Sequence, residues 1–223
     1  YAQSDAFPLT VQRLVSDVRK AMPGDGIVSL DNGMYKIWFA RQYKTMMGNT
    51  LLLDNALATM GAGLPSCIAA KLVYPERVSI AVCGDGGFMM NSQELETALR
   101  LNLHIVVVVL NNKSYGMIAW KASAMGMDDF GLNYGNPDFA DYARAYGAIG
   151  HSIKSAGEFL PTLEKAIKEH GVHVIDLPIS YETSDKALFE DLPRDMDALK
   201  KAVAKAISEE KKFDWDAVTA AQA

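Results

Sequence analysis

The stretch 84–112, GDGGFMMNSQELETALRLNLHIVVVVLNN, decides how this chain folds. It opens with an aspartate between glycines and closes with two asparagines. Between these ends lie the pattern of an amphipathic helix at 92–101 and a bare apolar strand at 104–110. Another strand without a polar face, at 78–83, comes just before the glycines. Such strands, joined by an amphipathic helix, are typical of a parallel sheet that is covered on both faces.

The same alternation extends along most of the chain. Periodicity predicts further strands at 27–30, 51–53, 149–153 and 172–177, and helices at 8–22, 64–73, 139–146 and 156–169. We therefore predict an α/β fold with a doubly wound, mostly parallel sheet of about six strands and helices on both faces. Residues 1–182 are expected to form this domain. Residues 183–223 are rich in charge and are expected to form a partly helical C-terminal arm, with a helix at 195–209.

Composition narrows the class of protein. The 223 residues include 22 basic and 27 acidic ones, well mixed, and the net charge of -5 argues against a nucleic-acid partner. The longest apolar run, 105–110, has only the length of a strand, so we expect no membrane partner. Cys67 and Cys83 lack metal-site spacing, which predicts buried free thiols and a cytoplasmic location. No signal-peptide pattern is present. The chain starts with Tyr1 rather than Met, and both a piece of a longer protein and a separate subunit stay open.

The two ends of the opening stretch carry the clearest chemistry. Asp85 follows one strand and Asn112 follows the next, so neighbouring strands would bring both to the edge where α/β proteins bind ligands. Carboxylate and amide oxygens suit Mg²⁺, and Gly86 and Gly87 let backbone N–H groups approach an anion. The pair predicts a metal-plus-phosphate site. Two other interpretations stay open: a tight turn followed by an ordinary loop, and a phosphate turn in a non-catalytic nucleotide-binding module.

With its GDG motif, helix, strand and NN pair, the chain resembles thiamine diphosphate enzymes. It is most similar to the diphosphate-binding, C-terminal third of acetolactate synthase large subunits, from about Leu9 to Tyr181. The similar stretches are LLLDNALATMGAGLP (51–65), CGDGGFMMNSQELETALRL (83–101), NNKSYGMIAW (111–120) and YGNPDFADYARAYGAIGH (134–151). The resemblance implies the thiamine diphosphate-binding fold. The motif is specific for the cofactor and less specific for the substrate, because pyruvate oxidases and 2-oxoacid decarboxylases share it.

The resemblance implies a set of metal and cofactor ligands. Asp85 and Asn112 would give side-chain oxygens to Mg²⁺, and Ser114 its backbone carbonyl. The cofactor-binding residues that it implies are Gly33, Tyr35, Ala58, Met60, Gly84, Gly86, Gly87, Tyr115, Gly116, Met117 and Ile118. Around the diphosphate, the family usually has a polar residue and His where this chain has Met34 and Tyr35.

Three apolar residues of this set would contact the rings of the cofactor. Met60 matches the wedge that holds the cofactor bent, and the Ala58 carbonyl, where the family often has Gly, would accept from the aminopyrimidine amine. Met117 and Ile118 would line the thiazolium and substrate side. Without the resemblance, Met60, Met117 and Ile118 would be interpreted as ordinary core.

The resemblance also implies a reaction. Thiamine diphosphate would serve as the electron sink while pyruvate is decarboxylated and condensed with a second 2-oxoacid to 2-acetolactate, in branched-chain amino acid biosynthesis. A thiamine-dependent 2-oxoacid decarboxylase or a pyruvate oxidase is the alternative. The activating glutamate belongs to a separate pyrimidine domain of the same or another chain. This chain would therefore hold no catalytic residue and is expected to be inactive alone, in a parent that forms a homodimer or tetramer. FAD would bind only in the missing part of the parent.

Other polar and aromatic residues receive simpler interpretations. Glu94 and Glu96 sit in an amphipathic helix, where a solvated or helix-capping role is expected. The histidines at 104, 151 and 173 are expected to be structural. Trp120 is a candidate for the lining of an access channel.

Overall fold

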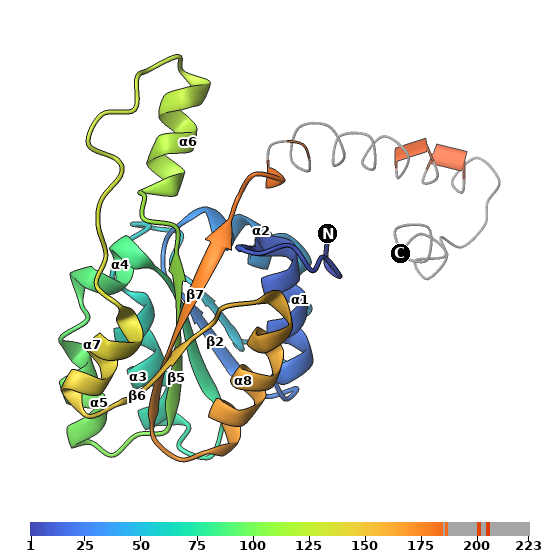
Figure 1. Ribbon diagram of the computed structural model, residues 1–223. Coiled ribbons are helices and arrows are strands. Elements are labelled where there is room, and N and C mark those ends of the chain that lie inside the picture. The colour runs from blue at the N-terminus through green and yellow to red at the C-terminus, as the bar shows by residue number, and fades with distance from the viewer. Residues whose placement is uncertain (185, 187–199, 202–203, 206–223) are drawn as a thin grey trace. The chain divides into compact units, whose positions relative to one another are not determined.

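The computed structural model describes residues 1–184, 186, 200–201 and 204–205 (Figure 1). Residues Tyr1–Ser180 form one compact unit, and Tyr181–Ala223 are assigned to a second. Most of the helix predicted at 195–209 and most of the arm predicted at 183–223 lie outside the described residues. Within the described ranges, every helix is too short or too polar to span a lipid bilayer.

Seven strands form one sheet in the described part of the chain, and all of their pairings are parallel. Their order is β1-β7-β5-β4-β2-β3, and β6 also pairs with β7. This confirms the predicted doubly wound, parallel sheet. The strands are β1 Leu9–Thr10, β2 Ile27–Leu30, β3 Leu51–Leu53, β4 Ser79–Gly84, β5 Ile105–Asn111, β6 Ile149–Ser152 and β7 Val172–Ser180.

The start of the chain differs from the prediction. The helix expected at 8–22 begins only at Val11, because Leu9 and Thr10 pair with the end of β7. Thr10 then caps this helix, since its side-chain oxygen accepts a hydrogen bond from the Arg13 N–H at 3.4 Å. A threonine that satisfies one of the free N–H groups of the first turn is a common helix start.

The other helices predicted within residues 1–184 are present, and three more lie between them. The structure has α1 Val11–Ala21, α2 Met34–Gln42, α3 Gly63–Val73, α4 Asp85–Met90, α5 Glu94–Arg100, α6 Gly116–Ala124, α7 Phe139–Tyr146 and α8 Ala156–Lys168. The patterns do not predict α2, α4 and α6. Helix α6 buries no side chain, so it lacks the apolar stripe that reveals an amphipathic helix. Helix α2 buries Met34, Tyr35, Trp38 and Phe39 along one side, but the apolar residues Ile37 and Ala40 on its other side weaken the contrast between its faces. Helix α4 consists of only six residues within the glycine motif.

The helices cover the sheet on both faces, with α1 and α8 on one side and α3, α5 and α7 on the other (Figure 1). On the second side, side chains from α3, α4, α5 and α7 pack with alternate residues of β4, β5 and β7 into one apolar cluster. Phe88 and Phe139 meet edge to face within it, with ring centroids 5.6 Å apart. The strands are buried on both faces because each face carries its own layer of helices.

Both cysteines are free and buried in this core, as the sequence predicts. Burial raises the pKa of Cys67 to about 12 and that of Cys83 well above its ordinary value. Thiols held in this way are unreactive, because the thiolate is the nucleophilic form. They act as small core side chains.

The chain reverses its direction across the sheet at β4. From β2 it moves outward to β3, then returns across β2 to β4, and continues away through β5 to β7. The carboxyl ends of β2, β4 and β5 therefore lie side by side at the point where the strand order switches. Such switch points form crevices that bind ligands in open α/β sheets.

Helix α3 starts very close to this edge, at Gly63. A Cβ atom added at Gly63 would lie 2.7 Å from the Cys83 sulfur and 2.9 Å from Cβ of Asp31. Both distances are well inside van der Waals contact, and the neighbours belong to strand ends that cannot move aside. Only glycine allows α3 to approach β2 and β4 this closely.

We predict that Gly63→Ala lowers the free energy of unfolding by about 1–3 kcal/mol, the usual cost of overpacking a tight core. Denaturant unfolding followed by circular dichroism measures this change. Gly157→Ala in the first turn of α8 is the matched control, since a Cβ there meets nothing within 4 Å. Equal stability of both variants would contradict the close packing of α3.

The four histidines of the chain gather at the opposite edge of the sheet. His151 and His173 stack with their rings 11° apart in orientation, and Nε2 of His151 lies 3.0 Å from Nδ1 of His173. Nε2 of His173 lies 2.7 Å from the carbonyl of Glu169, so it must carry the donated hydrogen. His104 packs beside this pair, with its Nε2 atom 3.0 Å from the carbonyl of Ala166. This geometry supports a structural role for these three residues.

The histidine pair predicts a loss of stability in mild acid. Burial is the main cause that lowers the pKa of both His151 and His173, assisted by neighbouring cationic and histidine side chains. Because the pKa in the folded protein lies below the ordinary value near 6.5, this contribution to stability is fully present above that value. It decreases as the pH falls below 6.5 and is lost as the pH falls through the lowered pKa. We expect urea unfolding at pH 7.5 and pH 5.5 to show a smaller pH dependence in His151→Gln than in the native protein. His170→Gln, at an exposed position, should retain the native dependence; an unchanged slope in His151→Gln would contradict this account.

Candidate functional site

The side chain of Asp85, at the end of β4, is the centre of the site. It is only 1% exposed and receives five hydrogen bonds. Oδ1 accepts from the Gly86 N–H and the Tyr134 hydroxyl, both at 2.8 Å. Oδ2 accepts from the N–H groups of Asn112 and Lys113 at 3.1 and 2.6 Å, and from the Asn136 amide at 2.8 Å. A buried carboxylate requires such partners, because burial without hydrogen bonds is very costly.

This arrangement confirms the predicted meeting of the GDG motif and the NN pair. Strands β4 and β5 are direct neighbours, with Gly84 in register with Leu110. The loop after β5 therefore lies against Asp85, and the backbone N–H of Asn112 makes the contact. The following residue, Lys113, adopts a left-handed backbone with φ of 56°, which turns its N–H toward the same oxygen.

A second layer of hydrogen bonds surrounds this carboxylate. The Asn136 amide donates to Asp85 and also to Oδ1 of Asn111, at 2.9 Å. The Asn111 amide donates in turn to Oδ1 of Asp176 on β7, at 3.0 Å. Oδ2 of Asp176 accepts from the Phe139 N–H at 3.4 Å, at the start of α7. Burial raises the pKa of Asp176.

A second buried carboxylate, Asp31, lies at the end of β2. Its oxygens accept from the Asn32 N–H at 2.6 Å and from the Gly61 N–H at 2.9 and 3.0 Å, with further backbone bonds from Ala62 and Gly63. Burial outweighs these bonds and raises the pKa of Asp31. The carboxylate therefore caps the start of α3 and holds the loop that carries residues 58–61.

The predicted ring-contacting residues lie in this loop and on α6. Ala58 is exposed with φ of 51°, in the left-handed region that favours glycine, which gives a physical reason for the glycine often found there in the family. Met60 and Met117 are half-buried, and Ile118 is 50% exposed. None of these three apolar side chains belongs to the buried core of the described residues.

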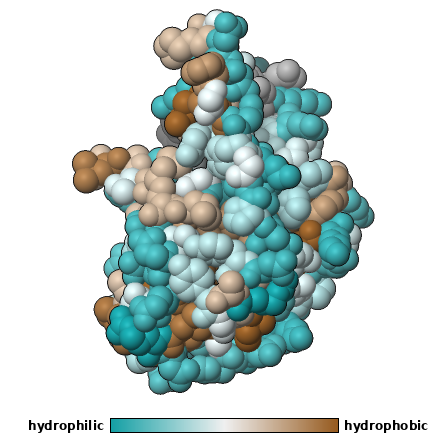
Figure 2. All heavy atoms as spheres, turned by 60° about the vertical axis from the view of Figure 1, so that its left-hand side comes forward, coloured by the Kyte–Doolittle hydropathy of each residue, from teal (hydrophilic) through white to brown (hydrophobic). Residues whose placement is uncertain are grey.

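The segment that carries α6 projects from the edge of the sheet (Figure 1). Figure 2 shows apolar side chains on this projecting segment at the top of the view. The exposed ones are Ile118, Met125, Met127 and Phe130, and Phe130 is 91% exposed. Trp120 also lies on this helix and is half-buried.

The base of the segment packs against the glycines of the motif. The rings of Tyr115 and Tyr134 lie 4.8 Å apart, and a Cβ added at Gly86 would come within 2.7 Å of both side chains. The Gly116 N–H donates to the Ser114 carbonyl at 2.9 Å. Ser114 forms an isolated antiparallel bridge with Asn133. The glycine at position 86 thus lets this segment return to Asp85.

Gly33 and Tyr35 lie at the start of α2, which follows the neighbouring strand β2. Tyr35 is buried, and its hydroxyl oxygen accepts the Gly84 N–H at 2.9 Å. Its ring lies against Gly33, where an added Cβ would come within 2.5 Å of the ring edge. The structure thus places both predicted residues beside the GDG motif.

The donor set at this edge fits a metal–diphosphate group. Among the described residues, no three His, Cys, Asp or Glu side chains come together as a metal site. One carboxylate with an amide neighbour is what Mg²⁺ uses when phosphate oxygens complete its coordination. Five donors already approach the Asp85 carboxylate, which offers about four lone-pair positions. A cation bound there would take the place of at least one of these donors.

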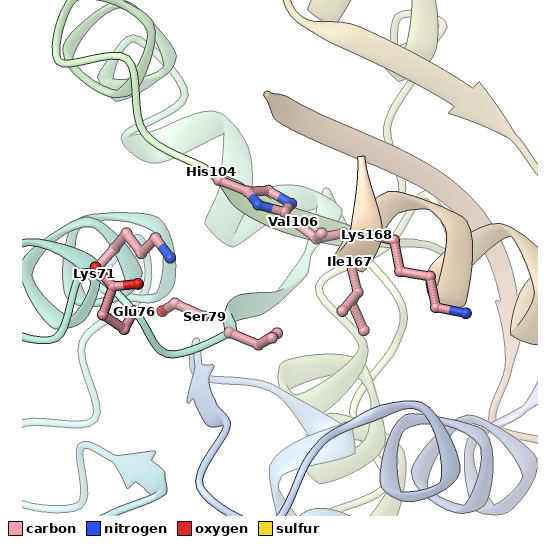
Figure 3. Close-up of a pocket in the computed structure, with 8 residues that line it drawn as sticks. Lys71, Glu76, Ser79, His104, Val106, Ile167 and Lys168 are labelled. Atoms are coloured by element: carbon pink, nitrogen blue, oxygen red, sulfur yellow. The ribbon is translucent and has the colours of Figure 1, made fainter. Parts of the chain in front are cut away.

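A hollow of about 290 Å³ lies at the other edge of the sheet (Figure 3). Its lining comes from α3, α8 and the starts of β4 and β5. Lys71 donates to the Arg77 carbonyl at 2.8 Å, and Ser79 contacts Cys67. Since β4 runs from Ser79 at this hollow to Gly84 at the other end, the hollow is separate from the Asp85 site.

The two glutamates on α5 lie outside the site. Glu94 accepts a hydrogen bond from Thr97 at 2.7 Å, and Glu96 pairs with Arg100 on the exposed face of the helix at 3.0 Å. These local contacts fit the expected solvated or capping role.

Sequence reasoning missed several residues of this site. Asp31 directly follows the strand β2, as Asp85 follows β4, and this parallel could have identified it. Asn111 stands in the NN pair itself. Tyr134, Asn136 and Asp176 carry no comparable signal, because they reach Asp85 or Asn111 only through the folding of distant segments.

Comparisons with known proteins show the family of this chain. A family model described as "Thiamine pyrophosphate enzyme, C-terminal TPP binding domain" matches residues 31–177; thiamine pyrophosphate is another name for thiamine diphosphate. The putative thiamine pyrophosphate-containing protein YdaP of Bacillus subtilis (strain 168) is 39% identical over 78% of this chain and 30% of its own length.

Other relatives have different names. An acetolactate synthase of Bacillus subtilis (strain 168) is 32% identical over 89% of this chain and 34% of its own length. A pyruvate oxidase of Lactiplantibacillus plantarum is 33% identical over 81% of the chain and 30% of its own length. The chain thus spans about a third of the length of these relatives.

A solved structure supports the fold. The thiamine diphosphate-dependent 4-hydroxybenzoylformate decarboxylase of Rhodococcus jostii RHA1 superposes with a TM-score of 0.75, at 24% identity, over 81% of this chain and 34% of its own. The resemblance expected from the GDG and NN motifs is confirmed by these matches. This chain belongs to the thiamine pyrophosphate enzymes, as their C-terminal TPP-binding domain.

Proposed function

We propose that this chain binds the diphosphate end of thiamine diphosphate through Mg²⁺ at Asp85. The carrying observation is the buried Asp85 carboxylate at the switch point of the sheet, with the loop of Asn112 in contact with it. Asp85 and the side chain of Asn112 would bind the cation, together with the backbone carbonyl of Ser114. These are hard oxygen ligands, and the phosphates would supply further oxygens.

The glycines beside Asp85 would hold the diphosphate itself. Gly86 and Gly87 lie in the first turn of α4, where backbone N–H groups lack helical partners and suit an anion. Gly84, Gly33 and Tyr35 surround the same strand ends. Tyr115 and Gly116 form the turn that leads from the metal loop into α6.

The loop held by Asp31 would position the rings of the cofactor. Asp31 fixes Gly61 next to Met60, so the thioether has a defined support from which to act as the wedge. The Ala58 carbonyl would accept from the aminopyrimidine amine, while Met117 and Ile118 would line the thiazolium and substrate side. When bound, thiamine diphosphate supplies the electron sink for decarboxylation; the protein supplies binding and orientation.

For the parent protein we propose the acetolactate synthase reaction, in which pyruvate is decarboxylated and condensed with a second 2-oxoacid. Support comes from the acetolactate synthase that matches 89% of the chain. The activating glutamate would come from a pyrimidine domain on the same or another chain, so this chain alone would be inactive. We further propose a cytoplasmic homodimer or tetramer that acts in branched-chain amino acid biosynthesis, with any FAD in the remaining part. The 33% identical pyruvate oxidase makes oxidation the second candidate, beside simple decarboxylation.

The first test concerns the metal ligand. We predict that Asp85→Asn in the full-length parent weakens Mg²⁺-dependent binding of thiamine diphosphate about 100-fold or more, because a hard cation loses its carboxylate. Isothermal calorimetry measures the affinity, and circular dichroism checks the fold. Asp141→Asn, which removes an exposed carboxylate paired with Arg144, should bind as the native protein does. Native affinity in Asp85→Asn, or a parent that binds no thiamine diphosphate, would refute the proposal in favour of a different phosphate-binding module.

The second test concerns the reaction. The purified parent, supplied with pyruvate, thiamine diphosphate and Mg²⁺, is expected to form 2-acetolactate as its main product. The products are measured by mass spectrometry, with FAD, phosphate and oxygen added in a parallel sample. Free aldehyde as the main product would identify a decarboxylase, and acetyl phosphate would identify an oxidase. Either result would replace the acetolactate assignment and leave the cofactor site intact.

A further inference from the structure

The first asparagine of the NN pair, Asn111, is not a proposed metal ligand, yet hydrogen bonds connect it to the metal site. Oδ1 of Asn111 accepts from the Asn136 amide at 2.9 Å, and its own amide donates to Asp176 at 3.0 Å. Asn111 ends β5 and Asp176 lies on the adjacent strand β7, in the middle of the sheet. The rigid sheet therefore anchors one end of this hydrogen-bond chain.

The other end of the chain reaches the Asp85 carboxylate. Both hydrogens of the Asn136 amide are used, one toward Oδ2 of Asp85 at 2.8 Å and one toward Asn111. Asp85 and Asp176 can only accept hydrogen bonds when ionised, so they fix the direction of every bond between them. If the side-chain amide of Asn136 or Asn111 rotated so that its oxygen and nitrogen exchanged places, each hydrogen bond would be replaced by a contact between two acceptors or between two donors.

The two oxygens of Asp85 are held differently. Oδ2 has three donors: two backbone N–H groups of the loop after β5, and Asn136. Oδ1 has one backbone donor, Gly86, and the hydroxyl of Tyr134. A hydroxyl on the returning segment is easier to displace than a backbone N–H in a turn. Oδ1 is thus the oxygen that can turn to a cation while Oδ2 stays fixed.

We propose that Asn136, Asn111 and Asp176 form a positioning relay that fixes Oδ2 of Asp85 and so presents Oδ1 to Mg²⁺. This inference rests on the proposed function, because it concerns the same metal. Residues around a metal ligand that orient it in this way typically change metal affinity 10–100-fold when they are replaced. None of the three is among the residues proposed to bind the metal or the cofactor, so they are positioning residues.

The decisive test exchanges the amide of Asn111 and the carboxylate of Asp176 between the two positions. Asn111→Asp alone places two carboxylates 3.0 Å apart in place of a hydrogen bond, and should weaken Mg²⁺ binding 10–100-fold. The double variant Asn111→Asp with Asp176→Asn keeps the same groups in reversed roles. The new amide at position 176 would donate to the new carboxylate at position 111, and its oxygen would still accept from the Phe139 N–H. The carboxylate at position 111 would also accept from the Asn136 amide, as the native amide oxygen does.

The experiment uses the full-length parent at saturating thiamine diphosphate, with Mg²⁺ titrated by isothermal calorimetry. We expect the double variant to recover Mg²⁺ affinity to within about threefold of the native protein, while Asn136→Leu loses 10–100-fold. Asn133→Leu is the matched control, since its amide contacts only the exposed Asp129 from the same segment and should bind normally. Thermal unfolding of each variant ensures that affinity is compared between folded proteins.

Two results would overturn the relay. One is native Mg²⁺ affinity in both Asn136→Leu and Asn111→Asp; the other is a double variant that binds no better than Asn111→Asp. If Asn136→Leu fails to fold, the Asn111 and Asp176 variants still decide the question. Loss of binding in Asp85→Asn together with normal binding in the relay variants would refute only this inference. A native parent that binds no thiamine diphosphate would refute the proposed function and the relay with it.

Discussion

Burial of the Asp85 carboxylate is the constraint on which this edge of the sheet depends. A carboxylate that is 1% exposed is tolerated only when hydrogen bonds replace its water, and here the donors come from four places in the chain. The returning segment after α6 must therefore reach back to the end of β4. Glycine at position 86 makes this possible, because any Cβ there would collide with Tyr115 and Tyr134. One buried charge thus fixes the loops around it.

Two buried carboxylates, Asp31 and Asp85, lie at neighbouring strand ends. The groups that donate hydrogen bonds to each of them indicate different roles. The hydrogen bonds to Asp31 come from the backbone N–H groups of Asn32 and of the residues at the start of α3. Gly87 closes over Asp31 so tightly that an added Cβ would lie 2.8 Å from its oxygen. Such a group has no room for a ligand and acts as a structural cap. Asp85 instead receives one of its five bonds from the Tyr134 hydroxyl on the returning segment, which can move aside. Exchangeable donors are what a metal-binding carboxylate requires.

The sequence predicts the parts of this structure that depend on local patterns. Apolar runs predict β4 and β5, and their adjacency brings Asp85 to the Asn112 loop as expected. Helix α6 is not predicted, because it buries no side chain and so lacks an apolar stripe. Asn136 and Asp176 are missed for another reason: their roles arise from contacts across 25 and 65 residues of chain, which no periodicity records. The roles assigned to the individual cofactor residues remain predictions.

The distribution of apolar surface divides the proposed site into a part for the diphosphate tail of the cofactor and a part for its rings. The tail of the cofactor would meet buried, hydrogen-bonded groups of this chain, whereas the residues assigned to its rings are half-buried or exposed. Ile118 is 50% exposed and lies on a segment that also exposes Met125, Met127 and Phe130. Apolar surface gathered on one projecting segment is typical of an interaction site. The chain spans about a third of the length of these relatives. The proposed function of this domain is therefore tested by measuring diphosphate binding and not by measuring turnover.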